Sequence, residues 1–193
     1  RAQRTLMIII PIVFILIFLL LYFTVRDPIE ALVVMLSVPF ALIGGVYMNF
    51  ILGYNFSVAV WVGFIALYGI ATETGVIMVV YLHEALDRRL QSKNGVITQK
   101  DIYEATIEGS VLRLRPKLMT VGTALIGLVP IMWSTGTGAD VMKPLTAPMI
   151  GGLITSAIHV LIVTPILFAI MKERALSKGT LKKSKMAHWI KES

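Results

Sequence analysis

The feature that most constrains this sequence is a run of 42 residues, 31–72, in which no side chain is charged. One transmembrane helix needs about 20 mostly apolar residues to cross roughly 30 Å of hydrocarbon, so this run is long enough for two helices. The Gly-Tyr-Asn-Phe-Ser segment at 53–57 is typical of a turn and divides the run. We therefore expect two membrane-spanning helices, over residues 29–52 and 58–82.

Three further segments lack charged side chains over the length of a span, namely residues 5–25, 118–139 and 144–171. Of all residues 56% are hydrophobic and only 15% are charged, against about 25% in a typical soluble domain. This composition excludes an ordinary soluble enzyme and a disordered chain. The sequence therefore predicts an all-α membrane protein with five transmembrane helices.

The uncharged segments divide the chain into five parts. They are a first transmembrane helix with a cytoplasmic turn (1–28), two transmembrane helices (29–82), a cytoplasmic amphipathic linker (83–116), two more transmembrane helices (117–171) and a basic cytoplasmic tail (172–193). In the linker, Thr98 followed by Asp101 resembles a capping box that opens a helix. Since Ile102, Ala105 and Leu112 share one face of that helix, we expect it to lie on the cytoplasmic interface.

The basic residues are distributed unevenly between the two ends of the expected spans. Fifteen of the 18 Lys and Arg side chains fall at residue 26, in the segment 83–117 or after residue 171. Because cytoplasmic loops are enriched in Lys and Arg, this side is expected to be cytoplasmic, with the C-terminus inside and the N-terminus outside. An outside N-terminus, an odd number of spans and a first residue other than Met also predict a piece of a longer protein.

The net charge of +7 follows from the same distribution. It indicates contact with the anionic headgroups of the lipid bilayer. It is weak support for nucleic-acid binding, because the basic residues are not interleaved with aromatic side chains.

Glu73 is the strongest candidate for a chemical role, because it lies about 15 residues into an apolar helix and so near the middle of the membrane. A charge at that depth costs about 2.5–3.5 kcal/mol on insertion scales, and such residues mark proton relays or ion paths. The alternative is a protonated carboxyl group that only hydrogen-bonds a neighbouring helix.

Lys117 begins the fourth expected span, and Thr120 and Thr123 follow at spacings that put them roughly on one helical face. Such a stripe would extend from the cytoplasmic rim toward Glu73. On spacing alone the simpler interpretation of Lys117 is a positive anchor that reaches the headgroups, and the same holds for Arg113.

Histidine and methionine are the other candidates for binding a proton or a metal. A lone histidine inside a span, such as His159, is more often a packing residue than a proton carrier or ligand, and His83 and His188 are expected at the interface. Most of the ten methionines are expected to be core or lipid-facing filler. Met142 is the exception, because it lies at the outer mouth and thioethers suit Cu(I) and Ag(I).

Small residues recur at helical spacing in two of the spans. Ser37, Ala41 and Gly45 follow one another every four residues, as do Gly152 and Ser156. Such faces let helices approach closely, so we expect both to pack against other helices. The sequence has no cysteine, no HExxH pair and no phosphate-binding Gly-rich loop, which argues against an enzyme and predicts no cofactor.

Several segments resemble the resistance-nodulation-division (RND) family of exporters, and in particular its heavy-metal branch. Asp-Pro-Ile-Glu at 27–30 with the segment 37–45 is similar to the start of a late transmembrane helix. Ala-Thr-Glu-Thr-Gly-Val at 71–76 resembles the central relay helix of the heavy-metal branch. Arg-Leu-Arg-Pro-Lys-Leu-Met-Thr at 113–120 resembles the start of the next helix, and 147–152 resembles the last helix.

The resemblance covers about residues 1–172 and implies the last five helices of a twelve-helix RND bundle. The implied partners are the remaining N-terminal half of the same pump, two further copies in a homotrimer, a periplasmic adaptor and an outer-membrane channel. The implied location is the inner membrane of a Gram-negative bacterium, with the N-terminus periplasmic. Proton influx would drive export of a heavy-metal cation, either Cu(I)/Ag(I) or a divalent ion of the Zn/Co/Ni/Cd class.

The resemblance also implies roles for individual residues. Glu73 and Lys117 match a glutamate and a lysine of the heavy-metal branch and are expected in the proton relay, whereas the multidrug branch has a lysine in place of Glu73. Arg113 and Thr120 match relay-supporting positions of the multidrug branch. Met142 matches a position in the methionine path for metal of the copper/silver type.

Three alternatives stay open at this point. A multidrug-type RND exporter shares the fold but not Glu73. A non-transporting membrane scaffold subunit predicts that Glu73 tolerates replacement by Gln or Leu. A passive channel needs more polar residues along a pore than one glutamate.

Overall fold

The computed structural model describes residues 2–25, 27–93, 95–179 and 181. These residues form seven α-helices, one 3₁₀ turn and one π turn: α1 (Ala2–Val25), α2 (Pro28–Met35), α3 (Ser37–Leu52), α4 (Val58–Ser92), α5 (Gln99–Leu128), η1 (Val129–Trp133), α6 (Ala139–Ile158), η2 (His159–Val163) and α7 (Thr164–Ser177). The part of the chain that the structure describes contains no strand, which confirms the all-α class.

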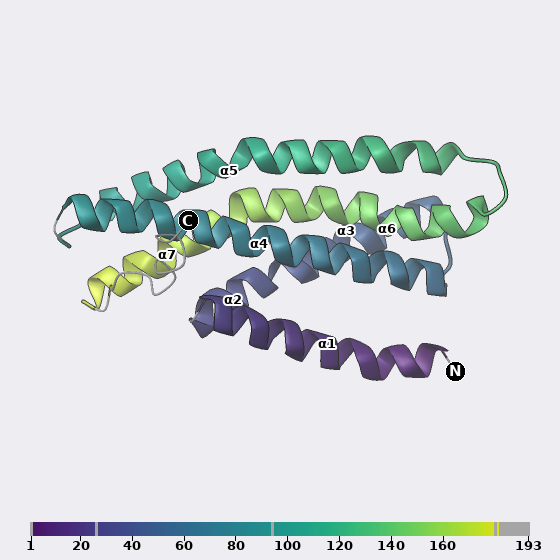
Figure 1. The fold of residues 1–193 in the computed structure, drawn as a ribbon, viewed down its shortest axis with the longest axis horizontal. Helices are drawn as coiled ribbons and strands as arrows, with labels where there is room; N and C mark the ends of the chain where they lie inside the picture. The colour runs from purple at the N-terminus through teal and green to yellow at the C-terminus, as the bar shows by residue number, and fades with distance from the viewer. Residues whose placement is uncertain (1, 26, 94, 180, 182–193) are drawn as a thin grey trace.

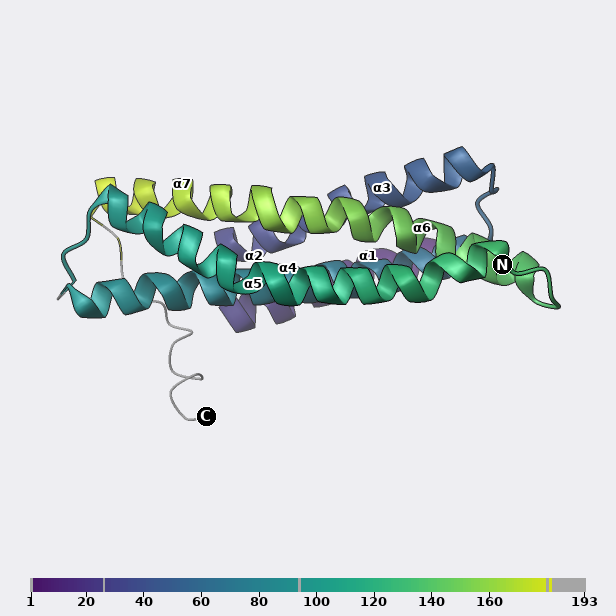
Figure 2. The same ribbon diagram turned by 90° about the horizontal axis from the view of Figure 1, so that it is seen from above.

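The helices run along one long axis, and successive helical units alternate in direction (Figures 1 and 2). The N-terminus, the α3–α4 connection and the α5–α6 connection lie at one end of the bundle (Figure 1). The α4–α5 connection and the end of α7 lie at the other end. This alternation matches the sidedness that the charge distribution predicts.

Within the described residues, four helical units are long and apolar enough to span a bilayer: Pro28–Leu52, Val58–Ser92, Gln99–Trp133 and Ala139–Ser177. In α1 the apolar stretch that was found, Pro11–Val25, is shorter than these four units. The expectation of several membrane-spanning helices is therefore supported, and the number five stays a prediction.

The first long unit is interrupted at Leu36, between α2 and α3. Pro39 has no N–H to donate to the carbonyl of Met35, so the regular hydrogen-bond pattern fails at this point. The Ser37 hydroxyl donates to the carbonyl of Val34 at 2.7 Å, which provides a local bond beside the interruption.

The last long unit contains a widened turn, η2. Pro165, in the first turn of α7, has no N–H to donate to the carbonyl of Leu161. The N–H of Thr164 bonds instead to the carbonyl of His159, five residues back. The π turn thus follows from the proline and keeps the 39 residues of this unit in one continuous rod.

The expected cytoplasmic linker is not a separate element in the structure. Helix α4 continues to Ser92 and α5 begins at Gln99, so residues 83–116 form the ends of two long helices and their connection (Figure 1). Residues 83–92 contain neither Gly nor Pro, so nothing in this stretch ends α4. The location of this segment at the membrane interface stays a prediction.

The start of α5 is well capped. The capping box of Thr98 and Asp101 is confirmed, and the N–H of Thr98 donates to Asp101 Oδ2 at 2.8 Å. Lys93 donates to the other oxygen, Oδ1, at 2.6 Å. Ile102 and Ala105 are buried against the end of α4 in an apolar cluster. Ile102 and Ala105 of the predicted amphipathic face therefore pack on a helix, whereas Leu112 is 46% exposed.

Helix α3 packs most extensively on α6, and the two backbones approach so closely that no side chain fits between them. A side chain at Gly44 would collide with the carbonyl of Gly151, and one at Gly151 would collide with the carbonyl of Gly44. The five small residues singled out in the sequence are all buried in these two helices: Ser37, Ala41, Gly45, Gly152 and Ser156. Gly44 and Gly151 extend the two stripes and make the closest approach.

Candidate functional site

The antiparallel arrangement of α4 and α5 brings Thr74 and Lys117 to the same depth. Thr74 lies 16 residues from the start of α4 (58 to 74), and Lys117 lies 16 residues before the end of η1 (117 to 133). At about 1.5 Å per residue, both are about 24 Å from the same end of the bundle. Lys117 is therefore in the interior of the described bundle, which does not support the headgroup-anchor interpretation.

The Lys117 side chain is only 2% exposed. Its Nζ donates to Thr74 Oγ1 at 2.9 Å, and the Thr74 hydroxyl in turn donates to the carbonyl of Ile70 at 2.7 Å. An ammonium group has three N–H donors, so one hydroxyl acceptor leaves two of them for other partners. The arrangement holds a cation inside the bundle beside the middle of α4.

Glu73 precedes Thr74 on α4 and lies on the exposed surface of this chain. It forms no hydrogen bond or ion pair with any other described side chain, although its charge acts on the Lys117 ammonium. The neighbouring Thr72 hydroxyl is buried and has no partner among the described residues. The structure thus separates the two expected relay residues: Lys117 faces inward, bonded to Thr74, and Glu73 faces outward.

Arg113 lies one turn before Lys117 on α5. Its guanidinium is 5.5 Å from the centroid of the Tyr81 ring on α4, which is within the range of a cation–π contact. Its Nε is buried and has no partner among the described residues. Thr120 is exposed, and its hydroxyl donates to the carbonyl of Pro116 within its own helix. Arg113 therefore flanks the Lys117–Thr74 contact, and Thr120 does not take part in it.

Met142 lies in the first turns of α6 and is 50% exposed. Helix α6 begins at Ala139, at the end of the bundle that carries the N-terminus (Figure 1). In the described ranges no group of three or more His, Asp or Glu side chains is arranged to hold a metal ion. The roles of Met142 and of the expected relay residues stay predictions.

The two histidines of the described part are both buried. His159 stacks on Phe40 with the ring centroids 4.3 Å apart, and neither ring nitrogen has a partner among the described residues. His83 is only 5% exposed, so its side chain is covered by protein, and its depth relative to the membrane interface stays a prediction. It is covered because α2 and α7 both pack on this part of α4. His188 and most of the predicted tail lie outside the described residues.

A buried ionic cluster around His83 was not predicted from the sequence. Its Nε2 lies 2.6 Å from Glu30 Oε2, and Lys172 Nζ lies 2.7 Å from Glu30 Oε1. His83 and Lys172 are 53 and 142 residues away from Glu30 in the sequence, so the tertiary fold brings the three side chains together. The one available signal was Glu30 itself, a carboxylate two residues after Pro28 at the start of a long apolar run.

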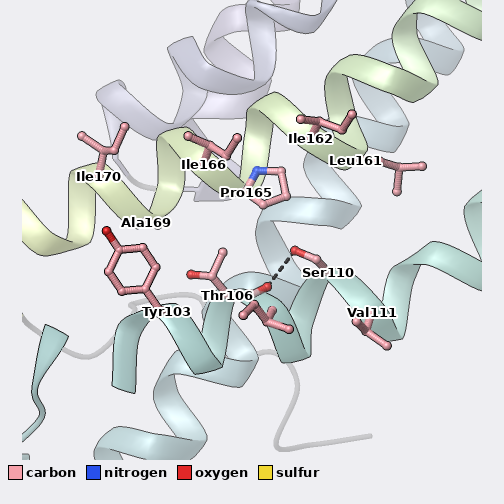
Figure 3. Close-up of a pocket in the computed structure, with 11 residues that line it drawn as sticks. Tyr103, Thr106, Ser110, Val111, Leu161, Ile162, Pro165, Ile166, Ala169 and Ile170 are labelled. Carbon is pink, nitrogen blue, oxygen red and sulfur yellow. Dashed lines mark hydrogen bonds between the residues drawn. The ribbon is translucent and has the colours of Figure 1, made fainter. Parts of the chain in front are cut away.

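A groove lies between α5 and the η2–α7 segment, with a volume of about 540 Å³ (Figure 3). The Thr106 and Ser110 hydroxyls in its wall donate to carbonyls of their own helix, so they present no free donor to it. The other lining side chains are mainly aliphatic, and no predicted site residue lines the groove. It is therefore an apolar surface feature apart from the Lys117 site.

Comparison with known proteins agrees with this architecture. Residues 1–172 match the AcrB/AcrD/AcrF family, whose members are RND efflux transporters. Since this match covers most of the sequence, the chain belongs to the AcrB/AcrD/AcrF family. Membership in this family, together with the long apolar helices, identifies a multi-pass membrane protein.

Within the family the similarity is to heavy-metal pumps, which confirms the resemblance stated from the sequence. The chain is 42% identical over 172 residues to the cation efflux system protein CusA of Escherichia coli, covering 89% of this chain and 16% of that protein. It is 35% identical over 167 residues to the cobalt-zinc-cadmium resistance protein CzcA of Cupriavidus metallidurans, covering 86% and 15%. The chain thus spans about a sixth of the length of these relatives.

A crystal structure of a heavy metal efflux pump has the same fold over the matched part. The TM-score is 0.75 at 33% sequence identity, and the match covers 89% of this chain and 16% of that chain. The helices described above therefore have the arrangement of one segment of a much longer pump.

Proposed function

We propose that this chain is the C-terminal membrane segment of a proton-coupled antiporter that exports heavy-metal cations. The observation that carries the proposal is that a carboxyl group exposed at mid-helix, Glu73, acts electrostatically on a buried ammonium group, Lys117, which is bonded to the adjacent residue Thr74. A carboxylate facing lipid at that depth is costly, so its exposed face is expected to be covered by another part of the pump.

In the proposed cycle the proton changes the charge opposite Lys117. When Glu73 is ionised, it attracts the Lys117 ammonium; when Glu73 takes up a proton, the attraction weakens and Lys117 keeps its bond to Thr74. The Lys117 side chain would thus exchange between two acceptors on the same helix. A change of charge at such a site biases the packing of α4 against α5, which is how proton uptake drives a conformational change.

The proposed cargo is a soft metal ion, Cu(I) or Ag(I), because the exposed methionine Met142 stands at the outer end of the bundle. A divalent metal of the Zn/Co/Ni/Cd class is the second candidate. It is supported by relatives that are named for nickel and cobalt resistance and for cobalt, zinc and cadmium resistance.

The proposed working unit is larger than this chain. It includes the N-terminal half of the same pump, assembles as a homotrimer and docks to a periplasmic adaptor and an outer-membrane channel. We propose that the bundle lies in the bacterial inner membrane, with the α4–α5 connection and α7 ending on the cytoplasmic side. The larger working unit is supported by relatives that are about six times longer than this chain.

Replacing Glu73 in the intact pump tests this function. The full-length protein with Glu73→Gln is expressed in a metal-sensitive bacterial host, and survival is scored across copper, silver, zinc, cobalt and cadmium. The proposal predicts that the wild type protects and that Glu73→Gln does not, although both reach the membrane at equal levels. Glu84→Gln is the matched control, because Glu84 lies on the same helix, where it makes only a partly exposed ion pair with Arg88.

The metal against which the wild type protects identifies the cargo. Proton flux into proteoliposomes during transport separates coupling from assembly, since Glu73→Gln should abolish the flux. Protection by Glu73→Gln equal to the wild type would instead indicate a packing residue and favour a scaffold role for this segment. Protection against organic compounds alone would favour the multidrug-type alternative.

A further inference from the structure

A buried ionic cluster joins three helices at the end of the bundle that carries the α4–α5 connection. The Glu30 carboxylate of α2 lies between His83 of α4, at 2.6 Å, and Lys172 of α7, at 2.7 Å. Glu30 and His83 are 2% and 5% exposed, and the Lys172 side chain is largely covered as well. One carboxylate is thus shared by two basic groups in a site that is nearly closed to solvent.

An aromatic ring completes the cluster. The His83 imidazole and the Phe168 ring are nearly perpendicular, at 87°, with the ring centroids 5.1 Å apart. Lys172 Nζ lies 5.3 Å from the centroid of the same ring. Because the face of an aromatic ring is electronegative, Phe168 favours the positive charge on Lys172.

The hydrogen-bond pattern fixes which atom of His83 is left to accept a proton. The Glu30 carboxylate, paired with Lys172, is an acceptor only, so His83 Nε2 must carry its hydrogen and donate it. In the neutral imidazole the lone pair is then on Nδ1. Uptake of one proton at Nδ1 turns the cluster from neutral to a net charge of +1.

The other acidic side chains near the cluster on its three helices have partners of their own. On α4, Asp87 lies one turn beyond His83 and is engaged with another group, and Glu84 contacts Arg88. On α2, Asp27 caps the helix by accepting from the N–H of Ile29. On α7, Glu173 contacts Gln99 and Tyr103 of α5. In the described residues, Lys172 is therefore the cation that competes with His83 for Glu30.

We propose that Glu30, His83 and Lys172 form a second proton-binding site, separate from Glu73, whose occupancy controls the attachment of α7 to α2. A protonated His83 bonds more strongly to Glu30 and repels Lys172, so the Lys172–Glu30 pair weakens. Loss of that pair loosens the contact between α7 and α2, because no other ion pair joins these two helices in the described residues. The site lies ten residues beyond Glu73 along α4, about 15 Å away.

A distance measurement across α2 and α7 tests the proposal in the intact transporter. Since this chain has no cysteine, spin labels are attached at Ile29→Cys on α2 and Arg174→Cys on α7, after native cysteines elsewhere in the pump are replaced by serine. Pulsed electron paramagnetic resonance then gives the distance distribution at about pH 8 and about pH 5, the range over which histidine titrates. The expected result is a narrow distribution at the higher pH and a longer, broader one at the lower pH.

His83→Gln separates a proton site from a structural contact. A glutamine amide still donates to Glu30 but does not titrate, so the narrow distribution is expected at both pH values. His159→Gln is the matched control, because His159 is equally buried but contacts Phe40, and the pH response should persist. Lys172→Met should give the broad distribution at both pH values and provides a second test if His83→Gln fails to fold.

Two results would overturn the proposal. The first is a wild-type distribution that is the same at both pH values. The second is a pH response of wild-type size in His83→Gln or in Lys172→Met, which would place the titrating group elsewhere.

Discussion

At the residue scale, the Thr74 hydroxyl is the key neighbour of Lys117. It accepts from the ammonium and donates to the carbonyl of Ile70, so both of its hydrogen-bonding functions are used. A buried cation that loses its acceptor bears the full cost of removal from water, which is larger than the net value of an ordinary hydrogen bond. Thr74 is thus expected to keep Lys117 inside the bundle.

Thr74→Val should lower the free energy of unfolding of the intact pump by about 1–3 kcal/mol, because it removes the acceptor while keeping the volume. The melting temperature in detergent measures the effect. Thr120→Val makes the same change at an exposed position that binds only its own helix, and should stay within about 0.5 kcal/mol of the wild type. Equal melting temperatures for the two variants would show that the Thr74 hydroxyl does not stabilise the buried Lys117.

The sequence was informative about single residues and uninformative about their partners. Glu73 and Lys117 stand out because charge is rare in apolar segments. The bond from Lys117 to Thr74 depends on how α4 and α5 are aligned, and a sequence without homologues does not contain that alignment. The burial of His83 was not predicted for the same reason, since the helices that cover it come from distant parts of the chain.

At the element scale, the crossing of α3 and α6 depends on glycine. Gly44→Ala should destabilise the pump by about 1–3 kcal/mol, because the added methyl group meets Thr155 and the carbonyl of Gly151. Gly122→Ala on α5 is the control, since a methyl group there meets nothing within 4 Å. It should be neutral or stabilising by about 0.5–1 kcal/mol. Melting temperatures that rank the two variants the other way would contradict the close approach.

The start of α5 offers a second prediction at this scale. Asp101→Ala removes the acceptor for the Thr98 N–H and for Lys93, so the first turn should fray at a cost of about 1 kcal/mol. Faster hydrogen exchange at residues 99–103 measures the fraying. Ser57→Ala, at the cap of α4, should have a smaller effect, because its bond to the N–H of Val60 is long, at 3.4 Å.

The elements themselves were largely predictable, because apolar length and turn residues decide them. The turn at 53–57 and the helix start at Thr98 follow from local chemistry and are present in the structure. The continuity of α4 through residues 83–92 was not predicted, since a change from apolar to charged composition was taken as the end of the helix. A change from apolar to charged residues indicates that the environment of a helix changes. The helix itself ends where capping residues, Gly or Pro stand.

At the scale of the whole molecule, the alternation of helices predicts which connections share a side of the membrane. Ser92→Cys near the α4–α5 connection and Asn55→Cys in the α3–α4 connection are both exposed and lie at opposite ends. A membrane-impermeant maleimide should label Ser92→Cys in inverted vesicles and Asn55→Cys in intact spheroplasts. Labelling of both positions from one side would contradict the topology.

The sequence could not predict which groups shield the exposed Glu73 carboxylate. In this chain the carboxylate faces outward, and its expected partners belong to the rest of a pump about six times as long. Family membership was within reach because four short segments carry it. The complete relay was not, since Glu73 and Lys117 make no direct bond in the structure and the proposed cover over Glu73 is a prediction.

The backbone contact between Gly44 and Gly151 has an evolutionary consequence. At most packed positions a gain of volume on one helix is offset by a loss on its neighbour, so pairs of residues drift together over time. Here each partner already has the smallest side chain that exists, and no neighbour is left to shrink. Both positions should therefore be held to glycine in related pumps, each independently of the other, while the residues around them vary.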